Sequence, residues 1–371
     1  MRCGYFEDGR CGSCTELRTP YDAQVAAKVE HCRRVLGDHP GLAWLPPVTS
    51  RPSGFRNKAK MAVGGTAERP TLGILDPHGH GTDLRTCGLY SPRMQALLPA
   101  LADLVGRAGL TPYDVPSRRG ELKHLLVTES PDGEHLVRFV LRSSEALPRL
   151  RKHLPALLAA RPDVVVVSAN LQPEHKAVLE GPEEVVLTER STLRVAVNDI
   201  ALHLGPQSFF QTNTEVAAAL YRQAAAWADE VAPTDVLDLY CGVGGFALHL
   251  AAPGRRVLGV EVSDQAVASA TTTAAELGLR DVAFLAGDAT TPPDSAADLV
   301  VVNPPRRGLG PELCAWLERS PARTLIYSSC RAESLARDLA ALPSYVAERA
   351  RLLDMFPQTG HYEVAVLLRR R

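Results

Sequence analysis

Short apolar runs alternate with longer amphipathic stretches along the C-terminal half of the chain. Apolar runs of about 4–8 residues are typical of buried strands, and apolar residues spaced three and four apart are typical of helices. The runs predict strands at residues 236–239, 256–260, 282–285, 298–302, 324–328 and 364–368, and the amphipathic stretches predict helices at 214–229, 263–278, 311–319 and 331–342. This alternation predicts an α/β fold with a parallel sheet, which binds ligands at the carboxyl ends of its strands.

The N-terminal half has a different order of elements. Apolar runs predict strands at residues 125–128, 136–140 and 164–167 and a helix at 147–160. This half is therefore predicted to be α+β. A chain of 371 residues is long enough for two hydrophobic cores. We predict one domain from residues 1–90 and 91–200 together, and a second from 201–371.

Composition narrows the class of protein. The chain is 45% apolar and 22% charged, which is ordinary for a globular protein, and its net charge is −1. It has no run of about 18 apolar residues and does not begin with the apolar segment of a secretory signal, so a cytoplasmic location is expected. In that compartment its eight cysteines favour metal binding or catalysis over disulfides.

A glycine-rich turn follows the 236–239 strand, in Asp238-Leu-Tyr-Cys-Gly-Val-Gly-Gly245. Glycines let the backbone turn sharply and let a ligand lie against main-chain N–H groups. Glu261 ends the next predicted strand, 19 positions after Gly242, where α/β folds place the acceptor for ribose hydroxyls. The Gly-x-Gly-Gly spacing departs from the dinucleotide-binding pattern. The turn therefore predicts a nucleoside-cofactor site, with a purely structural turn as the alternative.

Four cysteines predict a metal centre. Cys3, Cys11 and Cys14 lie among small residues that let a loop wrap closely around a centre, and Cys87 is the fourth candidate. Four thiolates hold either a tetrahedral zinc ion or an iron–sulfur cluster. A zinc ribbon more often has two Cys-x2-Cys knuckles, whereas this sequence has one, so an iron–sulfur cluster is favoured. Free cysteines in a flexible terminus are the alternative.

Two basic clusters predict contacts with RNA. Residues 51–60 carry four basic side chains, a phenylalanine and an asparagine without any acidic residue, and residues 118–124 form the second cluster. Arginine and lysine neutralise phosphates, while aromatic and amide side chains contact bases. A solvated surface is the alternative for each cluster.

Three polar residues stand at the ends of predicted strands. Asn303 follows the 298–302 strand, and Cys330 follows the 324–328 strand just before a helix. A helix N-terminus can lower the pKa of a cysteine from about 8.5 to about 3.5–7.5, which makes it a nucleophile; an ordinary buried cysteine is the alternative. Glu363 precedes the last strand, and it is either a general base or a salt-bridge partner.

Five motifs jointly resemble the RNA uracil-C5 methyltransferases. They are the Ser208-Phe-Phe-Gln211-Thr-Asn segment, the glycine-rich turn, Asn303-Pro-Pro-Arg306, Ser328-Ser-Cys330 and His361-Tyr-Glu363. The resemblance implies a Rossmann-like class I methyltransferase domain that uses S-adenosylmethionine (SAM), preceded by an α+β domain with a [4Fe-4S] cluster. The implied cluster ligands are Cys3, Cys11, Cys14 and Cys87. The implied SAM-binding residues are Gln211, Tyr240, Glu261 and Asn303.

The resemblance also implies a covalent mechanism on RNA. Cys330 is the implied nucleophile toward uracil C6, and Glu363 is the implied base for the C5 proton. The tRNA branch of the family lacks the four cysteines, and this chain has no room for the N-terminal β-barrel RNA-binding domain of another branch. The branch that methylates uridine 747 of 23S ribosomal RNA is therefore expected. Much of the family has aspartate where Asn303 stands, so a charge there is not required.

The expected target is a uridine in a hairpin or single strand, because the base must leave the stack to react. The alternatives are another ribosomal or tRNA uridine, and a catalytically inactive RNA-binding iron–sulfur protein. No membrane and no obligate protein partner are implied.

Overall fold

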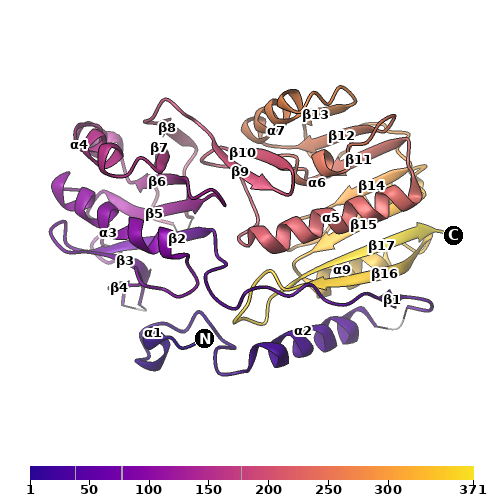
Figure 1. Ribbon diagram of the computed structural model, residues 1–371, viewed down its shortest axis with the longest axis horizontal. Helices are drawn as coiled ribbons and strands as arrows, with labels where there is room; N and C mark the ends of the chain where they lie inside the picture. Colours follow the sequence, from indigo (N-terminus) through magenta and orange to yellow (C-terminus); the bar gives the residue numbers. More distant parts are fainter. Residues whose placement is uncertain (38, 77, 177) are drawn as a thin grey trace. The chain divides into compact units, whose positions relative to one another are not determined.

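The computed structural model describes residues 1–37, 39–76, 78–176 and 178–371 of the chain. They form two compact units, most of whose elements are labelled in Figure 1. The first unit contains Met1–Cys14 and Pro52–Val195, and the second contains Thr15–Arg51 and Ala196–Arg371. The chain passes between the units close to the predicted boundary at residue 200. Residues 15–51, however, pack with the C-terminal half rather than with the N-terminal region in which we predicted them.

The second unit is built on a largely parallel sheet. In the described part of the chain, eight strands follow the order β1-β16-β17-β15-β14-β11-β12-β13. Their bounds are β1 Ala43–Trp44, β11 Asp235–Leu239, β12 Arg256–Glu261, β13 Val282–Ala286, β14 Leu299–Val302, β15 Thr324–Ser329, β16 Tyr345–Leu353 and β17 Glu363–Arg370. β11 to β15 run parallel to their neighbours among these five, and β17 runs antiparallel to β15 and β16. The parallel sheet is confirmed, and β1 and β16 are additions to it.

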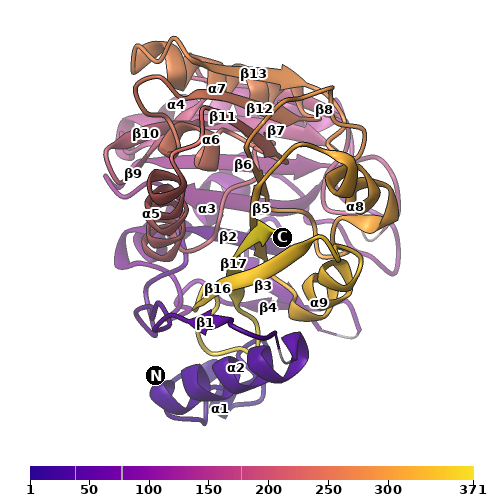
Figure 2. The same cartoon turned by 90° about the vertical axis from the view of Figure 1, so that its right-hand side faces the viewer.

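Helices cover both faces of this sheet. Figure 2 shows α5 on one face and α8 and α9 on the other. The bounds are α5 Thr214–Val231, α6 Gly245–His249, α7 Asp264–Glu276, α8 Gly310–Arg319 and α9 Ala332–Ala340. Asn213 caps α5 by accepting the Val216 N–H at 3.4 Å, and Ser263 caps α7 by accepting the Ala266 N–H at 3.3 Å. Within the described ranges, no helix combines the length and apolarity needed to cross a membrane.

Residues 15–51 add a helix and a short strand to the second unit. α2 (Tyr21–Leu36) packs against α9, and β1 pairs in parallel with β16. Cys32 and Leu36 of α2 are buried in the same hydrophobic core as α8, α9 and the sheet. This burial holds the segment to the second unit.

The first unit is a mixed sheet with helices packed on it. Among the described residues, seven strands follow the order β4-β3-β2-β5-β6-β7-β8, with β6 and β7 parallel and the other neighbours antiparallel. The strands are β2 Lys58–Gly65, β3 Pro70–Leu75, β4 Gly81–Asp83, β5 Leu122–Glu129, β6 His135–Leu141, β7 Val164–Leu171 and β8 Glu183–Val186. The helices are α1 Gly4–Glu7, α3 Pro92–Arg107, η1 Ser144–Ala146 and α4 Leu147–Ala160.

A separate two-stranded sheet contains β9 (Leu193–Val197) and β10 (Ile200–Leu204). In the first unit, α3 and α4 bury their apolar faces against β2, β5, β6 and β7. The α+β character predicted for this half is confirmed, as are its three predicted strands and its helix at residues 147–160.

Candidate active site

The predicted site residues of the second unit gather at one edge of its sheet. Tyr240, Glu261, Asn303 and Cys330 each stand at or just after the carboxyl end of a parallel strand. Glu363 begins β17, and because β17 runs antiparallel to β15, it reaches the same edge from the opposite direction. The topology therefore brings together residues that are far apart in the sequence.

The glycine-rich turn has an unusual backbone. Tyr240, Gly242 and Gly244 have positive φ angles of 63°, 55° and 85°. A Cβ on Gly242 would meet no described atom within 4 Å, so its main chain borders space in which a ligand can lie. A Cβ on Gly245 would lie 2.5 Å from the Tyr221 hydroxyl oxygen, so this glycine lets α6 pack. Gly242 thus agrees with the expected approach of a ligand to the main chain, whereas Gly245 is required for helix packing.

Two carboxyl groups fix this turn. Glu261 accepts the Gly242 N–H and the Ser263 N–H, each at 3.1 Å and each on a different oxygen. Asp238 is fully buried and accepts the Ala247 N–H at 2.9 Å, while its Oδ1 has no hydrogen-bond partner among the described residues. Burial raises the pKa of Asp238 to about 8. No role was predicted for Asp238, although an acid inside an apolar run is a signal for one.

Cys330 lies close to both a cation and a carboxyl group. Burial raises the pKa of its thiol, and the charge of Glu363 raises it further. Arg306 acts in the opposite direction through its charge and a hydrogen bond to the cysteine. The lowered pKa expected at a helix N-terminus is therefore wrong, because burial outweighs the groups that favour the thiolate. Arg306 belongs to a motif seen in the sequence but had no predicted role.

Glu363 is a buried carboxyl group beside this thiol. The register pairs Ser329 of β15 with Val364 of β17, so Cys330 and Glu363 lie on neighbouring strands at the same edge. Burial raises the pKa of Glu363 to about 7, and a 2.5 Å hydrogen bond donated by Ser328 Oγ works against this shift. A carboxyl group with a pKa near 7 is suited to proton transfer at neutral pH. The role of Ser328 was also not predicted.

A cavity of about 290 Å³ lies beside Cys330. Its lining comes from separate parts of the second unit: His31 of α2, Arg306 after β14, residues 330–333 at the start of α9, and residues 360–362 before β17. His31 Nδ1 and the Tyr362 hydroxyl are 2.8 Å apart. This volume is near the lower end of small-molecule pockets, which hold about 300–1,000 Å³.

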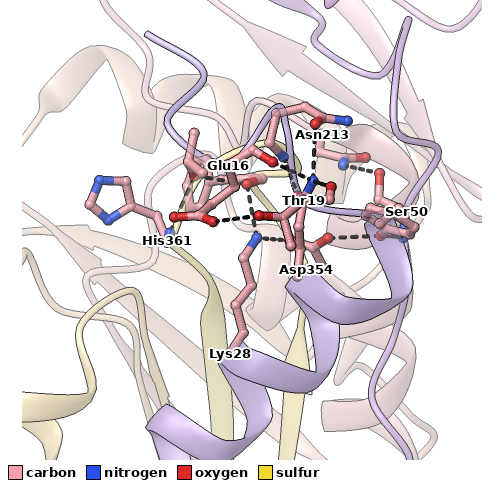
Figure 3. A network of polar contacts seen from close by, with 12 residues as sticks. Glu16, Thr19, Lys28, Ser50, Asn213, Asp354 and His361 are labelled. Carbon is pink, nitrogen blue, oxygen red and sulfur yellow. Dashed lines mark hydrogen bonds and ion pairs between the residues drawn. The ribbon is translucent and has the colours of Figure 1, made fainter. Parts of the chain in front are cut away.

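The loop before β17 is held to α2 by a buried polar network, shown in Figure 3. Lys28 Nζ lies 2.6 Å from Asp354 Oδ1 and donates to the Phe356 carbonyl at 3.1 Å. Tyr21 donates to Asp354 Oδ2 at 2.7 Å. The side chains of Lys28 and Asp354 are 3% and 0% exposed. Burial lowers the pKa of Lys28, and Asp354 opposes that shift.

Further hydrogen bonds continue this network on either side. Gln24 Nε2 donates to Gln358 Oε1 at 3.1 Å, and the Gln358 N–H donates back to Gln24 Oε1 at 2.9 Å. Gln358 has a positive φ of 68°. Asn213 Nδ2 donates to Ser50 Oγ at 2.7 Å, which ties the end of the N-terminal segment to the start of α5. Part of the cavity wall is therefore positioned by residues 15–51.

The remaining cofactor candidates lie in the second unit as well. Gln211 is 7% exposed, whereas Phe209, two residues earlier, is 71% exposed. Asn303 is half-buried. The loop after Asn303 is fixed by Asp338, which accepts the Leu309 N–H at 2.7 Å. The Ser208–Asn213 segment therefore turns the polar Gln211 side chain into the protein and leaves the aromatic Phe209 side chain in solvent.

The four predicted cysteine ligands are neighbours in the first unit. Burial raises the pKa of Cys14 to about 11, and the charges of Cys87, Cys11 and Cys3 raise it further. The hydroxyls of Tyr5 and Thr86, 2.5 Å apart, join the two segments that carry these cysteines. Of the residues that the structure describes, no group of three or more His, Cys, Asp or Glu side chains is arranged to hold a metal ion.

The two predicted basic clusters are partly occupied by structural contacts. Lys123 is buried and donates to a main-chain carbonyl at 2.7 Å. Arg56 donates to the Lys58 carbonyl at 3.0 Å, and Arg51 lies 2.9 Å from Glu215. Several of the side chains expected to meet phosphates therefore have partners within the protein.

Comparison with known proteins gives the family. The sequence model of the tRNA (Uracil-5-)-methyltransferase family matches residues 182–291 and 279–371. The chain is 47% identical over 375 residues to the 23S rRNA (uracil(747)-C(5))-methyltransferase RlmC of Yersinia pestis (strain Pestoides F). It is 50% identical over 379 residues to the RlmC of Halothiobacillus neapolitanus (strain ATCC 23641 / c2). Both alignments cover 100% of each chain.

A solved structure supports the same assignment. The Pyrococcus abyssi tRNA (uracil-54, C5)-methyltransferase, in complex with S-adenosyl-L-homocysteine, matches 96% of this chain and 84% of its own with a TM-score of 0.82 and 26% identity. The fold is therefore mixed α/β with a SAM-dependent methyltransferase fold, and SAM is supported as the cofactor. By sequence and by structure, the chain belongs to the tRNA (uracil-5-)-methyltransferase family, whose relatives include the RlmC enzymes.

Proposed function

We propose that this protein transfers the methyl group of SAM to C5 of uridine 747 in 23S ribosomal RNA. The observation that carries the proposal is the arrangement of Cys330, which directly follows β15, and Glu363, which begins the neighbouring strand β17. Cys330 lines a cavity of about 290 Å³, and Glu363 is buried behind it. A nucleophile and a proton acceptor are the two groups that this reaction needs. The RlmC relatives, 47–50% identical over their whole length, support both the reaction and the target.

Cys330 begins the reaction because uracil C5 is too weak a nucleophile to react unaided. Its sulfur adds to C6, and the electrons of the C5–C6 double bond move toward C5 and O4 to form an enolate. SAM would supply the methyl group: C5 bonds to the methyl carbon as the bond from that carbon to the SAM sulfur breaks, and S-adenosylhomocysteine leaves with the bonding electrons. Arg306 favours the thiolate that starts this sequence, since its charge opposes the effect of burial on the pKa of the thiol.

Glu363 completes the reaction. It accepts the C5 proton, the electrons of that C–H bond restore the C5–C6 double bond, and the Cys330 sulfur leaves C6. A positioned base of this kind contributes about 10²–10⁴-fold to the rate. Ser328 orients the carboxyl group through its 2.5 Å hydrogen bond.

SAM binding is assigned to Tyr240, Glu261 and Asn303 at this edge of the sheet, and to Gln211 in the segment before α5. Glu261 has the position of an acceptor for ribose hydroxyls, at the end of the strand after the glycine-rich turn. The open space beside Gly242 supports a nucleoside that lies against the main chain there. Asn303 offers an amide that both donates and accepts.

The target uridine is expected in a hairpin loop or single strand, since its base must leave the stack to reach Cys330. Methylation of a 23S RNA transcript should map to uridine 747 and should be lost when that uridine is replaced by cytidine. Methylation that maps to a different uridine would show that the target is wrong while the chemistry stands.

The nucleophile is tested with 5-fluorouridine at the target position. Fluorine cannot leave as a proton, so a covalent protein–RNA adduct should accumulate and survive a denaturing gel. Cys330→Ala should form none, while the exposed and distant Arg280→Gln should form it as the wild type does. An adduct of wild-type yield with Cys330→Ala would reject the assignment.

We also propose that Cys3, Cys11, Cys14 and Cys87 hold a [4Fe-4S] cluster. Support comes from the donor set, four thiols close enough to raise the pKa of Cys14. The cluster would join residues 3–14 to the segment that contains Cys87. Protein purified without oxygen should be brown, with iron and sulfide near four per chain, and a serine at any of the four positions should remove the colour. Stoichiometric zinc without iron would reject it.

A further inference from the structure

Four basic side chains surround the cavity beside Cys330. Arg306, Arg331, His31 and His361, here called the cationic rim, reach it from four different segments of the chain. Glu333 is the acidic residue among the described lining, 3.8 Å from His31 Nε2 and 3.5 Å from Arg331 Nε. These three side chains are between 40% and 58% exposed, and such long, exposed ion pairs are weak. The two arginines against this one glutamate leave the rim a net positive charge for a ligand, and the two histidines add hydrogen-bonding groups.

The methylation chemistry does not account for this charge. A uracil ring that enters the cavity is neutral, and Arg306 is the rim residue that touches the nucleophile. The cavity of about 290 Å³ has room for one base but little more. The phosphodiester groups on either side of that base would then remain at its mouth, where guanidinium and imidazole groups can donate to their oxygens.

We propose that the cationic rim binds the phosphodiester groups on both sides of the target uridine, and that His31 brings the N-terminal segment into this contact. The inference rests on the proposed function and deepens it by naming how the RNA backbone is held. His31 is well placed for this task, because its Nδ1 is 2.8 Å from the Tyr362 hydroxyl. Lys28, three residues earlier on α2, anchors the same helix through Asp354.

The first test is the salt dependence of RNA use by the full-length protein. His31→Gln and Arg331→Gln should each raise KM for a hairpin that contains uridine 747 by roughly tenfold, with kcat retained. Arg331→Gln should also reduce the slope of log(kcat/KM) against log[salt] by about 0.7, the value for one phosphate of a single strand. Arg331→Lys should keep the wild-type slope.

Arg280→Gln is the matched control, since Arg280 is exposed and precedes β13, at the opposite edge of the sheet. It should leave KM, kcat and the slope unchanged. KM for SAM should be unchanged in all variants. The proposal would be overturned if both rim variants kept the wild-type KM for RNA and the wild-type salt slope. It would also be overturned if the variants raised KM for SAM and not KM for RNA.

The second test neutralises the phosphates instead of the protein. A hairpin with methylphosphonate linkages on both sides of uridine 747 should raise KM for the wild type, and His31→Gln or Arg331→Gln should add nothing further on this RNA. If the increase in KM caused by the modified RNA and the increase caused by a rim variant were fully additive, the proposal would be overturned, because the rim would then contact another part of the RNA. Adduct formation on saturating 5-fluorouridine RNA should persist in both variants; its loss in the wild type as well would instead count against the proposed methylation mechanism.

Discussion

The buried ion pair between Lys28 and Asp354 provides a quantitative test of what holds residues 15–51 in the second unit. Replacing Lys28 with methionine keeps much of the side-chain length and removes its charge. Asp354 would keep the hydrogen bond from Tyr21 but lose its cation, and the Phe356 carbonyl would lose a donor. Removing one partner of a buried pair typically destabilises a protein by about 3–5 kcal/mol, because the other charge stays buried. We expect a loss of that size in the free energy of unfolding.

The second unit contains a matched control for this substitution. Arg256 and Asp235 form an ion pair of the same length, 2.6 Å, but the Arg256 side chain is 73% exposed. Exposed pairs contribute about 0–1 kcal/mol, so Arg256→Met should lose no more than that. The double variant Lys28→Met/Asp354→Leu should recover most of the loss, since it leaves no unpaired charge in the interior.

Urea unfolding followed by circular dichroism measures these differences, with the free energy in water taken from the linear dependence on urea. Losses for Lys28→Met and Arg256→Met that agree within experimental error would refute the reasoning, because the two pairs differ in burial rather than in length. A double variant as unstable as Lys28→Met would also refute it, since the penalty would then not come from the unpaired carboxylate.

Four further outcomes follow from Glu363 and Phe209. Glu363→Gln should lower turnover by about 10²–10⁴-fold and should accumulate a covalent adduct with ordinary uridine on a denaturing gel; product release at the wild-type rate would contradict its role. Because burial raises the pKa of Glu363 to about 7, turnover should rise with pH up to about 7, and the residual turnover of Glu363→Gln should lack that step. Stability should change in the other direction, because between pH 4.5 and about 7 the folded carboxyl group keeps its proton while the unfolded one ionises. The contribution of Glu363 to the free energy of unfolding is therefore full below its ordinary pKa of 4.5 and is lost as the pH rises to about 7. Urea unfolding of Glu363→Gln should not show this loss. Phe209 is 71% exposed and should stack on a base, so Phe209→Ala should raise KM for RNA by about fivefold or more without changing KM for SAM, whereas Leu277→Ala, also at an exposed position, should change neither.

The catalytic edge could be predicted because its signals are local. Tyr240, Glu261, Asn303 and Cys330 each follow an apolar run that forms a strand wherever it packs. Parallel strands bring their carboxyl ends to one edge, so neighbours in space follow from the topology alone. Helix caps are local in the same sense, since Asn213 and Ser263 each accept an N–H from the residue three positions later.

The position of residues 15–51 could not be predicted in this way. β1 is two residues long, and its partner β16 begins at Tyr345, so pairing depends on contacts that no local pattern encodes. One signal was present: Lys28 interrupts the apolar face of α2 that contains Val25 and Cys32. A lysine in such a position needs a buried partner, but the sequence does not say which of the chain's carboxylates it meets.

The pKa shift of Cys330 could not be predicted from the sequence either, because it depends on contacts between segments that are distant in the chain. The cysteine's place before α9 is local, whereas its burial and the nearby carboxyl group arise from β17, which ends the chain. A helix N-terminus stabilises a thiolate by a modest amount, and removing the thiol from water works against it. The larger effect depends on how the strands pack, so it required the structure.

The closeness of Cys330 and Glu363 also constrains how protons move. The charge of Glu363 disfavours the thiolate of Cys330. If the thiol gave its proton to Glu363, the carboxyl group would already be occupied when the C5 proton has to leave. The half-buried Cys330 lines the cavity, while Glu363 is 1% exposed. In the mechanism that we propose, the thiol proton would therefore leave through the cavity, where Arg306 favours the thiolate, and Glu363 would stay ionised for the second step.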